Sequence, residues 1–491
     1  MRTVSGATGR VVVVGAGLAG LSAALRLCGA GREVTVVERC ADPGGCAGRL
    51  RLGGYTFDTG PTVITMPRLI DDALRCVGER AADRLDLVRL DPVYRAFFAG
   101  GERLDVHSDT DRTAEAIAAL RGPAAAAGYR KFARWLADLY DVQWSRFIDS
   151  NADSPLRLVG RPLARLAALG GFRGLDAATR RFLPDDDIRR AFSFQALYVG
   201  LSPYDARALY AVIAHLDTIG GAVFPRGGVH EIPRALAAAA TAHGVRFHYA
   251  TAVSRIAVDG DRATGVVTES GEQIAADAVV VTGDLPTTYR DLLPARVAPR
   301  RLRFVRVSPS CVLLHVGSRT GYPQLAHHNV LFGTAWRRTF RELIDDGRLM
   351  SDPSLLVTVA SHTDPSLAPR GRHGYYVLAP VPATSNIDWA RIGPRYRDEL
   401  VRTLERRGYD GFGEAIEVER LVTPADWRAA GHANGTPFAA AHTVAQTGPF
   451  RFANMVRGLE NVVLAGAWTV PGVGVPMALV SGRLAAQRIT G

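Results

Sequence analysis

Hydrophobic and polar positions follow two different periods at the start of the chain. Residues 10–14 form a β-branched run typical of a buried parallel strand, and residues 18–30 carry apolar side chains at helical spacing. Residues 33–38 then alternate as a second strand. This order predicts a βαβ unit.

Helical spacing dominates the next two hundred residues. Residues 71–77 begin this region, and large apolar side chains recur at helical intervals in residues 129–148. Residues 154–174 mix leucines with arginines and predict one helix that Pro162 interrupts. Its basic edge and apolar stripe suit either a lid helix facing the core or an interfacial helix whose arginines reach lipid headgroups.

Strand patterns return in the second half of the chain. A helix over 229–243 and a strand over 246–249 precede a hairpin region over 253–284, which ends in a buried run at 278–281. Further strands are predicted at 302–316, 354–360, 375–380 and 461–465, with a helix at 391–407. The middle and the end of the chain are therefore expected to return to the first sheet.

Composition narrows the class of protein. The 491 residues predict two or three domains, since one domain takes roughly 150 residues. The net charge of +11 comes almost wholly from arginine, and no DNA- or RNA-binding motif accompanies it. A solvated basic surface or attraction to anionic lipid explains this charge, and nucleic-acid binding is not expected. The five cysteines form no C-x-x-C pair and favour a reduced, cytosolic compartment.

Neither a signal-peptide pattern nor 18 consecutive apolar residues occurs in the sequence. A membrane contact, if the protein makes one, is therefore expected at the surface of the bilayer.

A glycine loop follows the first strand. Gly15, Gly17 and Gly20 form G-x-G-x-x-G at the start of the predicted helix, and Glu38 ends the second strand. Glycine lets the backbone turn tightly and approach a pyrophosphate, whose charge then lies at the helix N-terminus. The acidic side chain accepts hydrogen bonds from ribose hydroxyls. The spacing therefore predicts a dinucleotide site.

Two further glycine segments favour a flavin dinucleotide. Gly44 and Gly45 come soon after the acidic residue, where their backbone would approach a cofactor extending beyond its adenosine half. Residues 472–477 place a helix N-terminus after the last predicted strand. Aimed at the pyrimidine edge of a flavin, its N–H groups would stabilise the negative charge that develops on reduction.

Several segments resemble one family. The chain is similar to the carotenoid desaturases of the bacterial phytoene desaturase type, flavoenzymes with the amine-oxidase-like fold, over nearly its whole length. The resemblance rests on "GAGLAGL", "DPGG", "YTFDTGPTVIT", "RRAFSFQALYVGLSPY", "FPRGGVHEIPRAL", "QLAHHNVLFG", "YYVLAPVP" and "LAGAWTVPGVGVP".

The resemblance implies a set of FAD-binding residues. These are Gly15, Gly17, Leu18, Ala19 and Gly20 at the pyrophosphate, Glu38 and Arg39 near the ribose, Gly44, Gly45, Cys46, Gly60 and Pro61 on the flavin side, Val253 at the adenine, and Gly466, Val475, Pro476 and Met477 at the isoalloxazine. Cys46 stands where the family usually has arginine. Its presence implies weaker binding or a substitute such as Arg39 or Arg49, and a covalent flavin link is a further alternative.

The resemblance also implies fold and function. We expect an α/β protein with a discontinuous Rossmann-type FAD-binding domain (1–75, 221–295 and 456–491), a helical substrate region (76–220) and a mixed-sheet substrate-binding domain (296–455). A membrane-facing surface on the helical region is one interpretation. The expected reaction is the desaturation of phytoene toward lycopene, by an enzyme peripherally bound to the cytoplasmic side of a membrane, with oxygen or a quinone as electron acceptor.

Other functions stay open on the sequence alone. The same fold suits a carotenoid cis-trans isomerase, a hydroxyneurosporene-type desaturase, a terminal oxidase or a lipid-binding escort protein of the Rab dissociation-inhibitor kind. A nicotinamide-dependent dehydrogenase is a further alternative.

No catalytic residue is assigned from the sequence. Asp149 and Glu231 are candidate proton acceptors by their region, although ordinary surface or capping roles suit both. His327 and His328 lack further ligands at metal-binding spacing, which favours a structural or substrate-lining role and no metal site.

Overall fold

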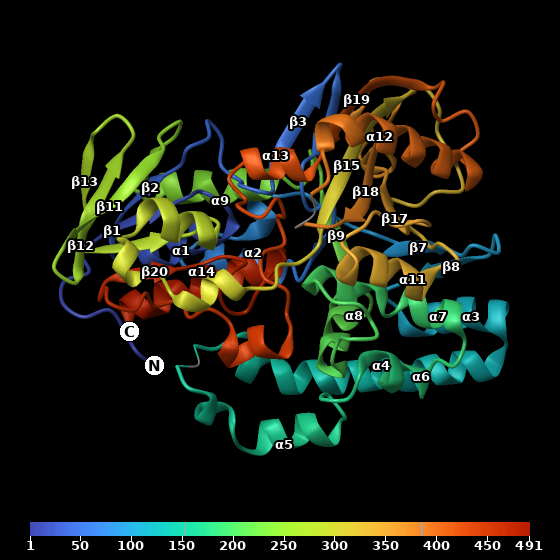
Figure 1. The fold of residues 1–491 in the computed structure, drawn as a ribbon, viewed down its shortest axis with the longest axis horizontal. Helices are drawn as coiled ribbons and strands as arrows, with labels where there is room; N and C mark the ends of the chain where they lie inside the picture. Colours follow the sequence, from blue (N-terminus) through green and yellow to red (C-terminus); the bar gives the residue numbers. More distant parts are fainter. Residues whose placement is uncertain (152, 384–385) are drawn as a thin grey trace.

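A five-stranded parallel sheet brings the two ends and the middle of the chain together (Figure 1). The computed structural model describes residues 1–151, 153–383 and 386–491. The strand order is β10-β2-β1-β14-β20. The bounds are β1 (Arg10–Val14), β2 (Glu33–Val37), β10 (Arg246–His248), β14 (Ala278–Val281) and β20 (Val462–Leu464). The predicted βαβ unit and the predicted return of later segments to this sheet are both confirmed.

Both faces of this sheet are covered, which explains its uninterrupted valines. Val11 and Val13 of β1 face a core shared with helices, whereas Val12 faces the core beneath an antiparallel sheet. The helices are α1 (Leu18–Gly29), α2 (Arg68–Arg75), α9 (Glu231–Ala242) and α14 (Val475–Thr490). The antiparallel sheet consists of β11 (Val253–Asp259), β12 (Arg262–Thr268) and β13 (Gln273–Ala275).

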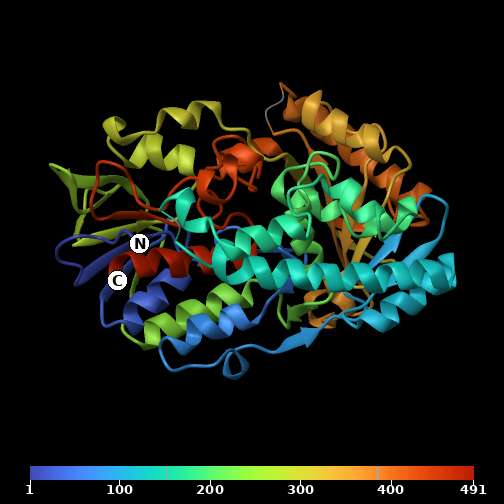
Figure 2. The same ribbon diagram turned by 90° about the horizontal axis from the view of Figure 1, so that it is seen from below.

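The first and last helices, α1 and α14, pack closely on each other. A Cβ atom added at Gly482 of α14 would lie 2.2 Å from the carbonyl oxygen of Ala19 in α1. The hydroxyl of Ser22 donates to the carbonyl of Leu479 at 2.7 Å. The two chain termini consequently lie side by side in both views (Figures 1 and 2).

A seven-stranded mixed sheet forms the second half of the molecule. Its order is β19-β15-β18-β17-β16-β7-β8, and only the β16–β7 pair is parallel among the described strands. The bounds are β7 (Tyr94–Phe97), β8 (Arg103–Val106), β15 (Ser310–Ser318), β16 (His328–Leu331), β17 (Leu355–Thr358), β18 (His373–Val381) and β19 (Ile416–Val422). Helix α12 (Trp389–Arg406) packs on one face.

The predicted strand over 302–316 is wrong at its start. Residues Arg300–Phe304 form a 3-10 turn, and β15 begins only at Ser310. Pro309 immediately precedes the strand, and proline has no N–H to donate to a ladder.

The helical region lies below the seven-stranded sheet in Figure 1, and the view from below shows the long helix α4 in front of it (Figure 2). Its helices are α3 (Thr110–Arg121), α4 (Pro123–Gln143), α5 (Arg161–Ala168), α6 (Leu175–Arg180), α7 (Asp186–Ala191) and α8 (Val212–Asp217). Region 76–220 is not wholly helical, because its strands β7 and β8 belong to the seven-stranded sheet. The domain boundaries stay a prediction.

The single helix predicted over 154–174 is also wrong. A 3-10 turn over Pro155–Leu158 precedes α5, which starts at Arg161 and carries Pro162 in its first turn. Proline is tolerated there because the first N–H groups of a helix lack intrahelical partners, so Pro162 starts the helix rather than interrupting it. In Figure 1, α5 lies at the lower edge, below α4.

Short elements connect these layers. They are β3 (Arg49–Leu52), β4 (Tyr55–Asp58), β5 (Ile64–Thr65), β6 (Leu87–Arg89), β9 (Ala222–Pro225), α10 (Leu285–Thr287), α11 (Trp336–Phe340) and α13 (Pro424–Ala429). In the described residues, no helix is long and apolar enough to cross a bilayer.

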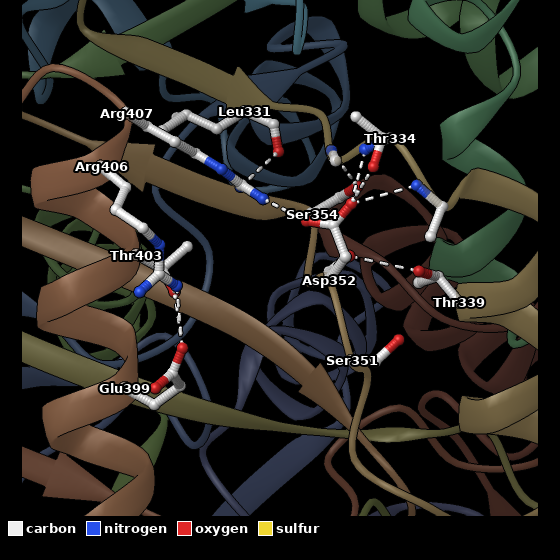
Figure 3. Close-up of polar contacts among 12 residues, drawn as sticks. Leu331, Thr334, Thr339, Ser351, Asp352, Ser354, Glu399, Thr403, Arg406 and Arg407 are labelled. Carbon is white, nitrogen blue, oxygen red and sulfur yellow. Dashed lines mark hydrogen bonds and ion pairs between the residues drawn. The ribbon is translucent and has the colours of Figure 1, made fainter.

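A polar network fixes α12 to the loop after β16 (Figure 3). One carboxylate oxygen of Asp352 accepts from the N–H groups of Thr334 and Ala335 at 2.6 and 3.0 Å. The other accepts from Arg407, at the end of α12, at 2.9 Å. Burial opposes the charge on Asp352, but these donors hold its pKa below the usual value. The network therefore joins the end of α12 to the loop after β16 and to the segment before β17.

Candidate functional site

One cavity of about 1990 Å³ joins the parallel sheet, the seven-stranded sheet and the helical region. Its walls include the residues that follow β1, β14 and β20, which are neighbours in the parallel sheet. Clefts at the carboxyl ends of parallel strands are the usual ligand sites of α/β folds. From there the cavity continues between α4, α8 and strands of the mixed sheet.

The glycine loop after β1 has the geometry that its motif predicts. Gly15 has φ +104°, and a Cβ atom there would lie 2.4 Å from the hydroxyl oxygen of Thr282, beyond β14. A Cβ at Gly20 would lie 2.0 Å from the carbonyl oxygen of Gly15. Both positions therefore require glycine, which keeps the loop backbone at the cavity wall.

Two helix N-termini open onto this cavity without a side-chain cap. Helix α1 starts after Gly17, and the N–H groups of Ala19 and Gly20 have no partner among the described residues. Helix α14 starts after Gly474, and in the same described part of the chain the N–H groups of Val475 and Met477 are also unpartnered. Unpaired N–H groups and the helix dipole favour negative charge at both places.

Glu38 lies at the end of β2, where the motif predicts an acceptor for ribose. Its Oε2 accepts the N–H of Ala16 at 2.7 Å, and its Oε1 accepts the N–H of Cys40 at 2.8 Å. Each carboxylate oxygen can accept a second hydrogen bond. The carboxylate is thus held against the glycine loop and still faces the cavity.

The second glycine pair lies directly against the first loop. The N–H of Gly44 donates to the carbonyl of Ala16 at 2.9 Å. Gly45 has φ +57°, and a Cβ atom there would lie 3.4 Å from Cα of Gly17. Two backbone segments therefore line one narrow part of the cavity, as a long dinucleotide requires.

The surroundings of Cys46 distinguish the two proposed substitutes for the missing arginine. Arg39 lines the cavity and donates to the carbonyl of Ala430, whereas Arg49 lies outside the lining and pairs with Glu231 at 3.5 Å. Sγ of Cys46 lies 3.8 Å from Nε2 of His432, and burial raises the pKa of this thiol. Arg39 is therefore the better placed substitute, and the raised pKa disfavours the thiolate that a covalent link needs.

The structure gathers the predicted cofactor residues around the cavity. With one exception they line it: Gly15, Gly17, Leu18, Ala19, Glu38, Arg39, Gly44, Gly45, Cys46, Gly60, Pro61, Val253, Gly466, Val475, Pro476 and Met477. The exception is Gly20, which packs behind the loop. Their roles toward a cofactor stay a prediction.

The proton-acceptor candidates from the sequence lie outside the cavity lining. Asp149 pairs with Arg483, and Glu231 pairs with Arg49 and Arg234. His327 is buried with Nδ1 2.7 Å from the hydroxyl of Thr363, so it has a structural contact.

His328 is the one of the two histidines that lines the cavity, and its Nδ1 lies 3.1 Å from the hydroxyl of Thr358. The described residues contain no group of three or more His, Cys, Asp or Glu side chains placed to hold a metal ion.

Sequence reasoning missed several residues of the cavity. Residues 282–284 line the cavity, and their position directly after the buried strand β14 was the one feature of the sequence that could have identified them. Asp284 accepts from the indole Nε1 of Trp468 at 2.8 Å and so links β14 to the loop after β20. Asp217 and Tyr198 also line the cavity, and no local pattern distinguishes them.

Arg451 was missed as well, and it organises the loop before α14. Its guanidinium is 3% exposed and donates to the carbonyls of Thr469, at 3.0 Å, and Ala467. Burial lowers the pKa of Arg451 to about 10, so the group remains charged at neutral pH. A buried cation consequently lies behind the loop that leads to the uncapped N-terminus of α14.

The donor set of the cavity fits FAD. Uncapped N–H groups at α1 suit a pyrophosphate, Glu38 suits a ribose, and uncapped N–H groups at α14 with a cation behind them suit the electron-rich end of a flavin ring.

Relatives cover the whole chain. It is 57% identical over 497 residues to a phytoene dehydrogenase of Streptomyces griseus, which covers 100% of this chain and 97% of the relative. It is 34% identical over 497 residues to a lycopene-forming phytoene desaturase of a Paracoccus strain, with 99% of this chain and 98% of the relative covered.

A solved structure shares the fold. An oxidoreductase from Methanosarcina mazei matches 96% of this chain and 99% of its own length, with a TM-score of 0.64 at 17% identity. The sequence profile described as flavin-containing amine oxidoreductase matches residues 18–490. The chain therefore belongs to the family of flavin-containing amine oxidoreductases.

Proposed function

We propose that this chain is an FAD-dependent carotenoid desaturase that removes hydrogens from phytoene to extend its conjugation toward lycopene. FAD is the cofactor, as family membership and the relatives indicate. The named activities of the Streptomyces and Paracoccus relatives support the substrate class.

The observation that carries this proposal is the continuity of the cavity. Its nucleotide end is built from backbone N–H groups and Glu38, whereas the remainder is lined mainly by apolar side chains such as Leu163, Leu166, Ile213 and Leu216. An apolar chamber beside a flavin site suits a long hydrocarbon, because burial of apolar surface is the main favourable term available to such a substrate.

Bound FAD supplies the acceptor for a hydride taken from the hydrocarbon. The residues of the chain hold and orient the substrate and exclude water from the chamber. The free N–H groups at the start of α14 would stabilise the negative charge that a bound flavin gains on reduction. Few polar residues are needed, since the charge that develops on a polyene spreads over adjacent double bonds.

Product mass tests this function. Purified, yellow protein is incubated with phytoene in liposomes, and the product mass is measured. Desaturation subtracts two hydrogens at each step, isomerisation leaves the mass unchanged, and oxidation adds oxygen. Unchanged phytoene with full FAD occupancy would contradict the proposal. Comparing oxygen with an added quinone under anaerobic conditions then identifies the electron acceptor.

We also propose that the mouth of the cavity docks on an anionic membrane surface. Val159, Phe172, Val444 and Phe450 are exposed and also line the cavity. Arg207 and Arg306 line the same cavity, and Arg161 and Arg165 lie on the nearby α5. Exposed apolar side chains beside arginines are typical of interfacial segments, whose arginines contact headgroups.

Flotation with vesicles tests the docking surface. Wild-type protein is expected to float with anionic vesicles and to be released progressively as salt rises, since salt screens the arginine contribution. Val159→Ser combined with Phe172→Ser should weaken binding without loss of FAD. Equal binding to neutral and to anionic vesicles would exclude a contribution of the arginines to membrane binding.

A further inference from the structure

One carboxyl group in the apolar part of the cavity has no partner among the residues that the structure describes. Asp217 ends α8 and lines the cavity together with Ile213 and Leu216 of the same helix. In the described part of the chain, no N–H, hydroxyl or cationic group donates to its carboxylate, and only burial acts on its ionisation. Asp217 is half-buried, and it is part of the cavity lining.

Other buried carboxyls of this protein have donors. Asp58 accepts the N–H of Val229 at 2.7 Å, and Asp364 accepts the N–H of Gly227 at 2.7 Å. Glu38 has two backbone donors. An unpaired carboxyl in an apolar wall costs stability, and an apolar side chain of similar size would pack there at no such cost. A contribution to the stability of the fold therefore does not explain why an aspartate occupies position 217.

The surroundings of Asp217 favour the protonated, neutral form of its carboxyl group. Burial raises the pKa of Asp217 to about 7. Burial also raises the pKa of Tyr94 and Tyr198, which line the same cavity, and the nearby Asp217 carboxyl raises both further. A group whose pKa lies near the operating pH accepts a proton and releases it again efficiently.

We propose that Asp217 is a catalytic residue that accepts the proton leaving the polyene during desaturation. This role rests on the proposed function. At one carbon the C–H bond breaks and its electron pair passes, as a hydride, to oxidised FAD. At the adjacent carbon the C–H electron pair becomes the new C=C bond, and its proton binds the carboxylate of Asp217. The hydrocarbon is thus oxidised by two electrons and FAD is reduced.

Anaerobic flavin reduction tests this residue in the holoenzyme. Wild type, Asp217→Asn and Asp217→Glu are mixed with phytoene in liposomes, and the loss of flavin absorbance is followed. Asp217→Asn should slow flavin reduction about 100-fold, the lower end of the effect of a general base, and Asp217→Glu should restore part of the rate. Asp149→Asn is the matched control, because Asp149 pairs with Arg483 outside the cavity lining, and it should reduce flavin like wild type.

Two measurements that do not depend on turnover accompany the rates. The FAD content and the phytoene retained by each purified variant should equal those of wild type. The infrared band of protonated carboxyls at pH 6 should be weaker in Asp217→Asn than in wild type, and the part that remains belongs to Asp58, whose pKa burial also raises to about 7.

Three outcomes overturn the role of Asp217. Flavin reduction at the wild-type rate in Asp217→Asn excludes a base at this position. Loss of FAD or phytoene binding in that variant shows a structural role instead. A wild-type holoenzyme that binds phytoene and never reduces its flavin refutes the proposed function, and the role of Asp217 with it.

Discussion

Single side chains decide how tightly the nucleotide end of the cavity is held. Glu38 has a dual role, since its oxygens hold the N–H groups of Ala16 and Cys40 and also face the place expected for ribose. Its removal is therefore expected to disturb both the glycine loop and the proposed contact with ribose.

We expect Glu38→Ala to weaken FAD retention by roughly tenfold or more, because a hydrogen bond to a charged group contributes about 1.5–3 kcal/mol. The measurement is the dissociation constant of FAD with the refolded apoprotein. Glu33→Ala is the control, since Glu33 lies at the other end of β2 and pairs with Arg246 at the surface. Equal affinities in both variants would refute the assignment of Glu38.

At the scale of elements, the contact between α1 and α14 links the two ends of the chain. Gly482 leaves no room for a Cβ atom against Ala19, and Ser22 donates to Leu479. Both uncapped N-termini belong to these helices, so the contact also fixes their separation.

Gly482→Ala should lower the free energy of unfolding by about 1–3 kcal/mol, as overpacking of a tight core does. It should also reduce FAD content, because the helices must move apart. Thermal unfolding followed by circular dichroism checks the first effect and flavin absorbance the second. Gly78→Ala is the control, since a Cβ at Gly78 meets no atom within 4 Å and only its φ of +81° adds strain. An equal loss of stability in both variants would show that the backbone conformation of glycine, and not the close packing of α1 on α14, accounts for the loss.

On the scale of the whole molecule, two classes of buried titratable groups oppose each other. Burial lowers the pKa of His315 and His328 to about 4 and that of His327 to about 3. Below the unfolded value of about 6.5 the unfolded chain binds more protons, so these groups reduce stability as pH falls. Burial raises the pKa of Asp58 and Asp217 to about 7, so these two reduce stability as pH rises from about 4 to 7.

Asp217→Asn isolates one of these contributions. Above pH 7 the variant should unfold at a higher temperature than wild type, because the buried charge is gone, and near pH 4 the difference should vanish. Differential scanning fluorimetry at pH 4 and pH 8 measures this difference. A difference that is the same at both pH values would show that Asp217 ionises normally.

Much of the fold was predictable because the signals are local. The strand at 10–14, the helix after it, the hairpin region at 253–284 and the last strand were confirmed, since periodicity and glycine turns are fixed by neighbouring residues. The prediction that Pro162 interrupts a helix is wrong because this proline lies in the first turn of α5. The predicted start of β15 is wrong because the strand begins only after Pro309.

The sequence by itself determined the cofactor chemistry. The glycine loop, Glu38 and the terminal glycine segment each need only a few adjacent residues to create N–H donors and an acceptor. The strands β1, β14 and β20 each correspond to a valine-rich run, which is typical of a strand buried in a parallel sheet. The sequence therefore predicts that these segments share one sheet, and that the loops after them lie close together.

Only the tertiary structure decided which side chains line the cavity. Asp149 and Asp217 look alike in the sequence, yet Asp149 forms an ion pair with Arg483, whereas Asp217 lines the cavity and has no partner among the described residues. Arg39 and Arg49 also look alike in the sequence, yet Arg39 lines the cavity and Arg49 pairs with Glu231 outside the lining. The physical reason is that burial and partners come from elements distant in sequence, whose packing no local pattern specifies.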